Sequence, residues 1–220
     1  MIIALIPAKK NSTRIIGKNM KLLKKKPLFQ YSVEAARKSK FIKKIFVSSD
    51  DDKILSLTKR LNCEAISRPK KLSKNNTPIN HVIMHFIEYL KKKKIFATTI
   101  VLLQPTSPIR ENKILDKLIN KYSRNKKTLV TVKKDNNKYL KGIIKYSKKV
   151  APVMSKYFNS NDQQLPLMYI PNGSVYIFSV KKFLKEKSIP IKNLIIYEMF
   201  DKFNINIDTI EDFKNAKKKI

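Results

Sequence analysis

The feature that most constrains the fold is an alternation of short apolar runs with helical patterns in the first part of the chain. The apolar runs have the length and β-branched content of strands. They cover Ile2–Ile6, Lys44–Ser48, Cys63–Ile66, Thr99–Leu103 and Leu129–Lys133. Helical patterns lie between them, at Leu28–Ser39, Lys53–Leu61, Ile79–Lys92 and about Asn112–Tyr122. Such alternation is typical of βαβ units. The sequence therefore predicts an α/β fold in three layers, doubly wound around a mostly parallel sheet.

Two of these helices carry signals for their first residues. Asp50–Asp52 precede the second helix and are expected to cap it. Thr77 and Pro78 offer an N-cap and a first-turn proline for the third helix.

The pattern changes after Lys134. Residues Asp135–Pro171 are polar with short alternating stretches, which predicts a hairpin-based insertion with too few apolar residues for a core of its own. Such a segment needs a partner surface. Regular patterning returns at Gly173–Phe178, Leu194–Met199 and Ile205–Ile207, and a last helix is expected from about Thr209. We therefore expect one domain, 1–220, with an insertion at about 135–171 that forms a homodimer contact.

Composition excludes some classes of protein. The chain carries 49 Lys and Arg against 16 Asp and Glu, a net charge of +33. The lysines are spread along the whole chain without a zinc-finger, RRM or helix-turn-helix signature, so we expect biased composition and no dedicated nucleic-acid partner. No apolar segment is long enough to cross a membrane, no signal peptide is expected, and the single cysteine, Cys63, fits a reducing cytoplasm.

A cationic loop follows the first strand and points to a phosphate site. The strand stops at Pro7, and the loop carries Lys9, Lys10, Asn11, Ser12, Thr13, Arg14 and Lys18. In open α/β sheets ligands bind at the carboxyl ends of strands. The chain has three glycines and lacks both GxGxxG and the Walker A pattern. Side chains must therefore supply most contacts to a nucleotide, and a solvated basic loop is the alternative.

Two further clusters follow strand patterns. Gln104 opens the segment Gln104–Arg110, and a glutamine at a central strand end can hydrogen-bond a base or a sugar, although a helix-capping turn would use the same residues. Asp208 stands between Ile207 and the last helix, where it either caps the helix or binds Mg²⁺. His81 and His85 have zinc-ligand spacing but lack the adjacent glutamate and a third ligand, so we expect no zinc site.

Taken together, six segments resemble a known family. The chain reads IPAKKNSTRIIGKN, VSSDDDKI, SRPKKLSKNNT, LLQPTSPIR, QQLPLMYIPNGSVYIF and INIDTIEDF in that order. The same order is seen in the acylneuraminate cytidylyltransferases, the synthetases of CMP-sialic acid and of its legionaminic and pseudaminic relatives. The resemblance implies a fold of the nucleotide-diphospho-sugar transferase type. It also implies that the anomeric hydroxyl of an acidic nine-carbon sugar attacks the α-phosphorus of CTP, with Mg²⁺ or Mn²⁺ as cofactor, in a homodimer.

The resemblance also implies roles for particular residues. Triphosphate contacts are expected from Lys9, Asn11, Ser12, Arg14 and Lys18, with Arg68 near the nucleotide. Sugar contacts are expected from Gln104, Lys141, Asn172 and Tyr176, with Lys141 lent by the neighbouring subunit. Asp208 is the expected metal ligand, and Arg14, Lys18 and Asp208 are expected to carry catalysis.

Departures from the family pattern keep other functions open. Lys9 replaces the usual Arg, Asn206 replaces a second metal-site Asp, and Asp162 stands where relatives often have Arg. A CMP-Kdo synthetase-like nucleotidyltransferase and a nucleotide-binding homologue without turnover are the alternatives. The sequence does not choose among nonulosonic acids.

Overall fold

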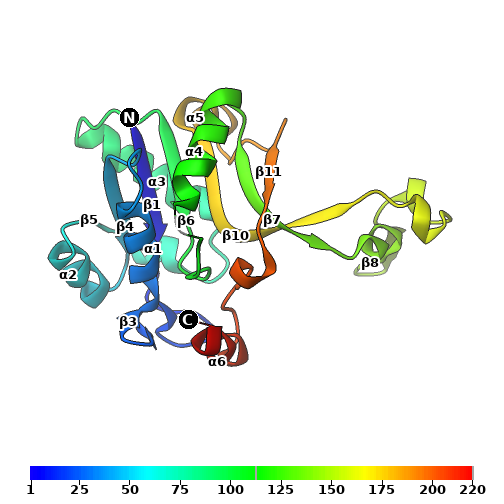
Figure 1. Ribbon diagram of the computed structural model, residues 1–220, viewed down its shortest axis with the longest axis horizontal. Coiled ribbons are helices and arrows are strands. Elements are labelled where there is room, and N and C mark those ends of the chain that lie inside the picture. The colour runs from blue at the N-terminus through cyan, green and yellow to red at the C-terminus, as the bar shows by residue number, and fades with distance from the viewer. Residues whose placement is uncertain (112, 220) are drawn as a thin grey trace.

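Seven strands form the central sheet of the computed structural model, which describes residues 1–111 and 113–219 (Figure 1). In chain order they are β1 (Ile2–Pro7), β4 (Lys44–Ser49), β5 (Glu64–Ser67), β6 (Thr99–Leu103), β7 (Leu129–Asp135), β10 (Met168–Ser179) and β11 (Ile195–Glu198). Their order across the sheet is β11-β7-β10-β6-β1-β4-β5. Within this described sheet β10 alone runs antiparallel, pairing with β6 and β7, while the other pairs are parallel. The mostly parallel sheet predicted from the sequence is confirmed.

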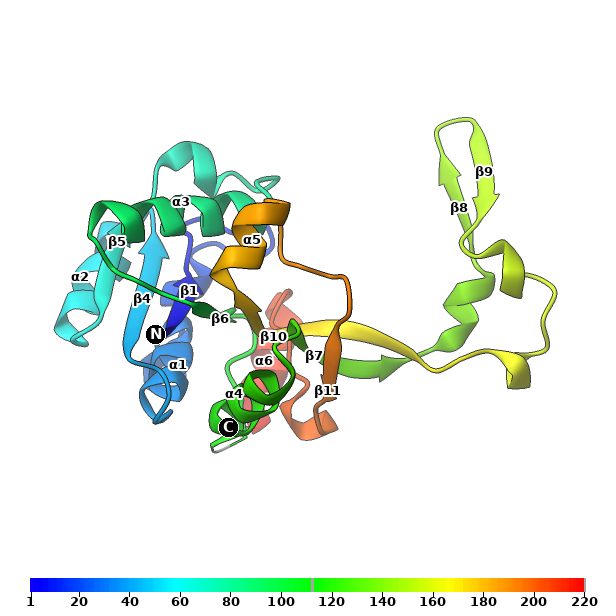
Figure 2. The ribbon, with the colours of Figure 1, turned by 90° about the horizontal axis from the view of Figure 1, so that it is seen from above.

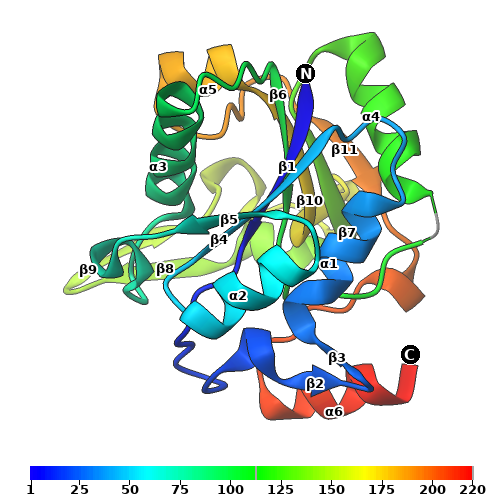
Figure 3. The same ribbon diagram turned by 90° about the vertical axis from the view of Figure 1, so that its left-hand side faces the viewer.

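Helices cover both faces of the sheet, as Figure 2 shows. One face packs against α1 (Leu28–Arg37), α2 (Asp52–Arg60) and α4 (Ile114–Asn125). The other packs against α3 (Ile79–Lys92) and α5 (Val180–Glu186). The last helix, α6 (Ile210–Lys219), packs near the short pair β2 (Leu22–Leu23) and β3 (Lys26–Pro27) (Figure 3). The three predicted layers are confirmed.

Burial on both faces explains the continuous apolar run of β1. Successive side chains of a strand point to opposite faces. Ala4 and Ile6 accordingly belong to the cluster under α1 and α4, whereas Ile3 and Leu5 belong to the cluster under α3. All four are fully buried. Because of this apolar run, β1 lies in the interior of the sheet, between β6 and β4. The loop that follows its carboxyl end therefore begins among the ends of the neighbouring strands.

Most predicted elements are found close to their expected bounds, and α3 and β6 match them. Asp51 caps α2, accepting a hydrogen bond from the Lys53 N–H at 2.9 Å. The expected cap at Thr77 is wrong, because Pro78 holds the N-cap position without a side-chain bond. The predicted first residue of α4, Asn112, lies outside the described residues.

The expected regular element at Ile205–Ile207 is absent, because this segment has neither helix nor strand. It crosses the end of the sheet instead of joining an edge. The Ile207 N–H donates to the Thr106 carbonyl at 2.7 Å, which lies in the loop after β6. This single backbone hydrogen bond to a loop is not the repeated hydrogen-bond ladder that defines a strand.

The segment 135–171 forms an arm that extends from β7 and β10 away from the sheet (Figures 1 and 2). It contains the predicted hairpin, β8 (Ile143–Tyr146) paired with β9 (Lys149–Pro152). Short 3₁₀ helices flank the hairpin at Asn137–Lys141, Ser155–Tyr157 and Asp162–Gln164. Its large apolar side chains are largely exposed, among them Tyr139, Ile143, Tyr146, Val150 and Leu167. The homodimer contact expected here stays a prediction.

Candidate active site

A cleft of about 290 Å³ opens at the carboxyl ends of β1, β5 and β6. The loops after these strands supply most of its lining side chains. These are Lys9, Ser12, Thr13, Arg14, Lys18, Asn19, Arg68, Leu72, Lys74, Asn75, Thr77, Gln104 and Thr106. Five of them are cations, and no aspartate or glutamate is among the described residues that line the cleft. This arrangement suits a polyanionic ligand.

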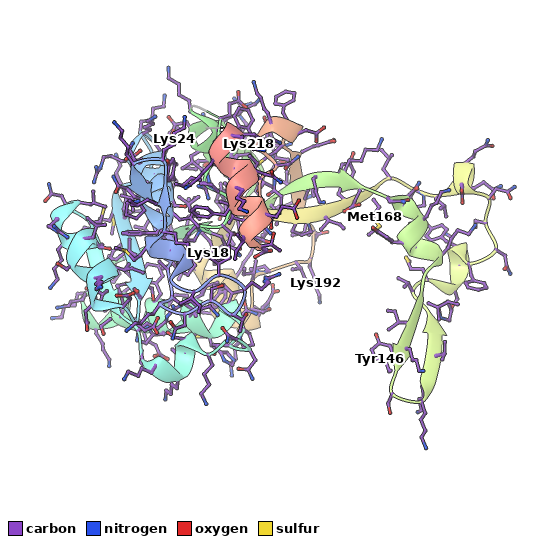
Figure 4. The ribbon with its side chains drawn as sticks, turned by 90° about the horizontal axis from the view of Figure 1, so that it is seen from below. Lys18, Lys24, Tyr146, Met168, Lys192 and Lys218 are labelled. Atoms are coloured by element: carbon purple, nitrogen blue, oxygen red, sulfur yellow. The ribbon has the colours of Figure 1, made fainter. Side chains whose placement is uncertain are left out.

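Lys18 is the most deeply buried ammonium in this lining, with 8% of its side chain exposed. It lies on the main body beside α6, far from the arm that carries Tyr146 (Figure 4). Its Nζ donates to the Ile207 carbonyl at 2.7 Å and lies 3.4 Å from Asp208 Oδ1. Burial lowers the pKa of Lys18, and the Asp208 carboxylate only partly opposes that effect. An arriving phosphate would favour the charged form.

Asp208 joins the loop after β1 to the segment before α6. Its Oδ1 also lies 3.0 Å from Nη2 of Arg14, and its Oδ2 accepts from the Asn206 amide at 2.9 Å. Asp208 does not cap α6. The Asp212 carboxylate accepts the N–H groups of Asp208 and Thr209, and the Thr209 hydroxyl accepts the Asp212 N–H, as in a capping box. The capping alternative for Asp208 is therefore wrong.

Arg68 forms the opposite wall and is 5% exposed. Its Nη2 lies 3.6 Å from Asp50 Oδ1, which already accepts the Lys10 N–H at 2.9 Å. Nε and Nη2 of Arg68 have no hydrogen-bond partner within the described part of the chain. Burial lowers its pKa against the opposing effect of Asp50. A buried guanidinium with such donors at the wall of a cleft is a candidate contact for a polar ligand.

Gln104 extends from the end of β6 into the same cleft. Arg110 fixes its backbone, because Nη2 donates to the carbonyls of both Gln104 and Ser174 at 3.0 Å. Gly173 lies against its side chain. A Cβ at Gly173 would stand 3.1 Å from Gln104 Oε1, and its φ of +74° favours glycine. The β10 bulge therefore sets where the Gln104 amide points.

Asn172, expected to contact the sugar, lies in the β10 bulge and is 8% exposed. Its Oδ1 accepts from the Thr131 hydroxyl at 2.7 Å and from the Ser174 N–H at 3.0 Å. Its Nδ2 donates to Asn204 Oδ1 at 2.7 Å and contacts Met199 Sδ at 3.2 Å. The amide is thus fully used inside the protein, and Asn172 does not line the cleft.

The structure places the other two expected sugar residues outside the cleft. Tyr176 lines a second, mainly apolar cavity of about 450 Å³ that shares one wall residue, Ile79, with the cleft. Lys141 lies on the arm, where its Nζ is 3.4 Å from Asp162 Oδ1. Within one chain, therefore, the cleft gathers Lys9, Ser12, Arg14, Lys18, Arg68 and Gln104 but neither Tyr176 nor Lys141.

Comparison with known proteins identifies the family. A family model described as "Cytidylyltransferase" matches residues 3–219. The chain belongs to the cytidylyltransferase family. Nucleotidyl transfer is the activity of this family.

Curated relatives of this cytidylyltransferase are similar over nearly all of its length. The CMP-N,N'-diacetyllegionaminic acid synthase of Legionella pneumophila is 27% identical over 99% of this chain and 95% of that protein. The pseudaminic acid cytidylyltransferase of Campylobacter jejuni is 26% identical over 98% of this chain and 94% of that protein. The N-acylneuraminate cytidylyltransferase of Escherichia coli is 26% identical over 98% of this chain, which spans about half (51%) of that longer protein.

A solved structure supports the fold. The chain superposes on a CMP:2-keto-3-deoxy-manno-octonic acid synthetase complexed with CTP with a TM-score of 0.70, covering 99% of this chain and 97% of that one. Sequence identity is 13%, so this likeness concerns the fold alone.

The cleft of this cytidylyltransferase contains residues that its sequence did not predict there. Lys74, Asn75 and Thr77 line it from the loop before α3. Asn75 accepts a hydrogen bond from Lys9 Nζ at 2.9 Å, which links this loop to the loop after β1. They belong to the SRPKKLSKNNT segment, in which the sequence predicts a nucleotide contact only for Arg68 and a helix cap for Thr77. The one expected residue of the loop after β1 that is absent from the lining is Asn11, which is exposed.

The oxygen donors that could hold a metal are few. Asp208 and the Asn206 amide lie together, and no group of three or more His, Cys, Asp or Glu residues is placed for a metal within residues 1–111 and 113–219. One carboxylate with an amide suits Mg²⁺ that keeps waters and substrate phosphates as ligands, and does not suit a site in which the protein supplies every ligand.

No helix of the described residues is long and apolar enough to span a membrane.

Proposed function

We propose that this cytidylyltransferase transfers CMP from CTP to the anomeric hydroxyl of a nonulosonic acid and releases pyrophosphate. The observation that carries the proposal is the cleft itself, whose described lining holds five cations and no carboxylate, and where buried Arg68 keeps donors without a hydrogen-bond partner in the same part of the chain. The names of the relatives supply the sugar class. Legionaminic, pseudaminic and N-acylneuraminic acids are all acidic nine-carbon sugars.

The triphosphate is held by the loop after β1 in this proposal. Lys9, Ser12, Arg14 and Lys18 offer charged and hydroxyl donors along one wall, and Arg68 offers from the other its Nε and Nη2, which have no hydrogen-bond partner among the described residues. Charge on the departing pyrophosphate grows as the bond to the α-phosphorus breaks. Fixed cations at that place stabilise the transition state more than the ground state.

The proposal includes Mg²⁺ or Mn²⁺ as cofactor. Asp208, assisted by the Asn206 amide oxygen after a flip of that group, would hold it. When bound, such an ion neutralises and orients phosphate oxygens. The side chains of the cleft have the other roles in this proposal. Arg14 and Lys18 pair with phosphates, and Gln104 hydrogen-bonds and orients the sugar beside it.

The sugar lies on the side of Gln104 and Tyr176 in this proposal. The cavity lined by Tyr176 meets the cleft at Ile79, so a nucleotide and a sugar can occupy neighbouring spaces. Lys141 reaches the sugar only from a second subunit, which makes a homodimer part of the proposal. A cytoplasmic location is proposed as well, because CTP is available there.

Pyrophosphate release with CTP and a panel of acidic sugars tests the proposed function. We expect release with at least one nonulosonic acid and a preference for CTP over ATP, GTP and UTP. Release only with 3-deoxy-manno-octulosonate would favour the Kdo alternative, and CTP binding without release would favour a homologue that has lost turnover. Equal rates with two nucleotides would contradict the base preference.

Substitutions in the loop after β1 sharpen that assay. Arg14→Ala and Lys18→Ala should each lower turnover at least ~10-fold, since a hydrogen bond to a charged group contributes about 1.5–3 kcal/mol. Lys59→Ala, which removes an exposed lysine on α2, is the matched control and should leave turnover unchanged. Wild-type rates in folded Arg14→Ala and Lys18→Ala variants would mean that the loop is a solvated surface.

A further inference from the structure

The segment that carries Asp208 has little structure of its own. Between β11 and α6 the chain forms one short 3₁₀ turn, Asp201–Phe203, and then runs without helix or strand to Thr209. The segment is located by the ion pairs of Asp208 with Arg14 and Lys18, by the fully buried Ile207 side chain and by a few hydrogen bonds to the rest of the chain. The Ile207 N–H donates to Thr106, the Lys18 ammonium binds the Ile207 carbonyl, and Asn204 accepts from Asn172. The position of Asp208 therefore depends on these polar contacts together with the burial of Ile207.

The contact between Asn172 and Asn204 has a fixed direction. The Ser174 N–H can only donate, so it identifies the oxygen of the Asn172 amide and turns the NH₂ group toward Asn204. Asn204 must then accept through its oxygen, and its own NH₂ donates to the Met199 carbonyl at 2.7 Å. Each amide thus has one orientation that satisfies all of its neighbours.

The sheet side of this contact is rigid. Asn172 is held from the bulge of β10 by the Ser174 N–H and from β7 by the fully buried Thr131 hydroxyl. Its backbone carbonyl also accepts from the Ser107 hydroxyl at 3.2 Å, in the loop after β6. Contacts from β7, from β10 and from the loop after β6 therefore hold the backbone and the side chain of Asn172, and its side-chain amide in turn holds Asn204.

We infer that Asn172 is a positioning residue that acts through Asn204 to hold the segment carrying Asp208 against the sheet. This inference differs from the sugar contact expected by resemblance, because all hydrogen-bonding positions of the Asn172 amide are already occupied. Its effect on catalysis rests on the proposed function, in which Asp208 holds the metal. Its effect on the segment itself does not.

Hydrogen–deuterium exchange tests the inference without substrate or metal. Asn204→Ala removes the contact from the segment side and leaves the Asn172 oxygen with its donors from Ser174 and Thr131. We expect amides at 204–208 to exchange roughly 3- to 10-fold faster, as the loss of one hydrogen bond permits, while amides of β1 and β6 are unchanged. Asn172→Ala should give the same result. The double variant should add little to either, because the two amides act through one contact.

The matched control is Asn125→Ala. Asn125 is exposed and also donates to a backbone carbonyl, that of Lys121 at 2.9 Å, but lies at the end of α4. Exchange at 204–208 should remain at the wild-type rate in this variant. Unchanged exchange there in Asn204→Ala would overturn the inference. Asn204→Ala also removes the bond to the Met199 carbonyl, so faster exchange in Asn204→Ala but not in a folded Asn172→Ala would overturn the inference as well.

Kinetics separate a positioning residue from a substrate contact. In an active enzyme, Asn204→Ala and Asn172→Ala should raise the Mg²⁺ concentration for half-maximal rate with little change in KM for the sugar. A raised sugar KM with unchanged Mg²⁺ dependence in Asn172→Ala would make Asn172 a substrate contact and overturn the inference. Absence of turnover in the wild-type protein would contradict the proposed function, and the exchange experiment would still decide the positioning role.

Discussion

Asp208 is the partner of two of the five cations that line the cleft. Arg14 Nη2 and Lys18 Nζ lie 3.0 and 3.4 Å from the same carboxylate oxygen. A triphosphate has more negative charge than one carboxylate, so it competes well for both cations. Under the proposed function, both cations turn toward phosphate and leave Asp208 available to a metal ion. Nucleotide binding and metal binding should therefore strengthen each other.

The pKa of Lys18 predicts how CTP binding depends on pH. Burial lowers that pKa below the ordinary lysine value of 10.5, with Asp208 opposing the shift. Only the protonated ammonium attracts phosphate, so CTP affinity should fall as pH rises through this lowered pKa. An arginine keeps its charge to about pH 12 and above. In Lys18→Arg, calorimetry should therefore show the alkaline loss of affinity displaced to higher pH, although Lys9 still contributes because burial lowers its pKa too.

The control for that measurement is Lys59→Arg on the exposed face of α2, which should follow the wild-type curve. If Lys18→Arg and wild type lose CTP affinity over the same pH range, Lys18 does not bind the triphosphate.

The pair Asn206 and Asp208 predicts a metal response that can be engineered in both directions. Asn206→Asp places a second carboxylate where the amide now lies 2.9 Å from Asp208 Oδ2. Half-maximal rate should shift to Mg²⁺ concentrations lower by roughly tenfold, because ligand charge tunes affinity for such cations. Without Mg²⁺ the two carboxylates repel, so Tm should fall and should recover on adding Mg²⁺ with CTP. Asp208→Asn should shift the Mg²⁺ requirement upward and nearly abolish turnover.

Melting curves and rates against Mg²⁺, recorded for both variants, check this prediction. The segment Thr209–Asp212 caps α6 in each of them, so loss of the cap does not confuse the result. Normal turnover in a folded Asp208→Asn variant would leave Asp208 without a metal role.

At the level of elements, the parallel part of the sheet could be predicted because local sequence determines it. β1 and β6 are buried on both faces and read as continuous apolar runs, and most of the cationic side chains of the cleft follow β1 directly in the chain. The antiparallel direction of β10 and the bulge at Asn172 depend on pairing with distant strands. The positions of Lys74 and Asn75 in the cleft could not be predicted for the same reason. Their loop, which precedes α3, lies beside the loop after β1 in the folded chain although the two are far apart in the sequence.

The β10 bulge predicts different outcomes for two glycine substitutions. Gly17 and Gly173 both have positive φ, +62° and +74°, so alanine at either should cost about 1–2 kcal/mol of stability. At Gly17 the added Cβ meets nothing within 4 Å, whereas at Gly173 it stands 3.1 Å from Gln104 Oε1. Gly173→Ala should therefore also displace the Gln104 amide and raise KM for the sugar, which Gly17→Ala should not do.

Thermal melting and sugar kinetics of the two alanine variants test that difference. Similar Tm losses with a raised sugar KM only in Gly173→Ala are expected. A wild-type sugar KM in Gly173→Ala would show that the orientation of Gln104 is not set by the bulge.

The whole molecule combines an apolar arm with a strongly positive charge. The arm carries exposed apolar side chains that a second copy could cover, yet each chain has a net charge of +33, and the segment 135–171 itself has six lysines and two aspartates. Burial of apolar area favours association, and repulsion between like charges opposes it. The balance between these effects depends on ionic strength, since salt screens exposed charges over about 10 Å at 0.1 M.

We therefore predict a homodimer through the arm that becomes tighter as salt is added. Sedimentation at micromolar concentration should show a larger dimer fraction at about 0.5 M than at about 0.05 M NaCl, because the Debye length falls severalfold over that range. Ile143 and Val150 are both 61% exposed on the hairpin, so Ile143→Asp and Val150→Asp should each shift the protein to monomer.

The control for these two variants is Phe96→Asp. Phe96 is 86% exposed on the main body, so this substitution should leave the dimer intact. Because Lys141 lies on the same arm, the two hairpin variants should also lose turnover with the sugar while keeping CTP affinity. A compact wild-type monomer with full activity would contradict the dimer, and a dimer that weakens steadily with salt would show that ion pairs rather than apolar contacts hold it.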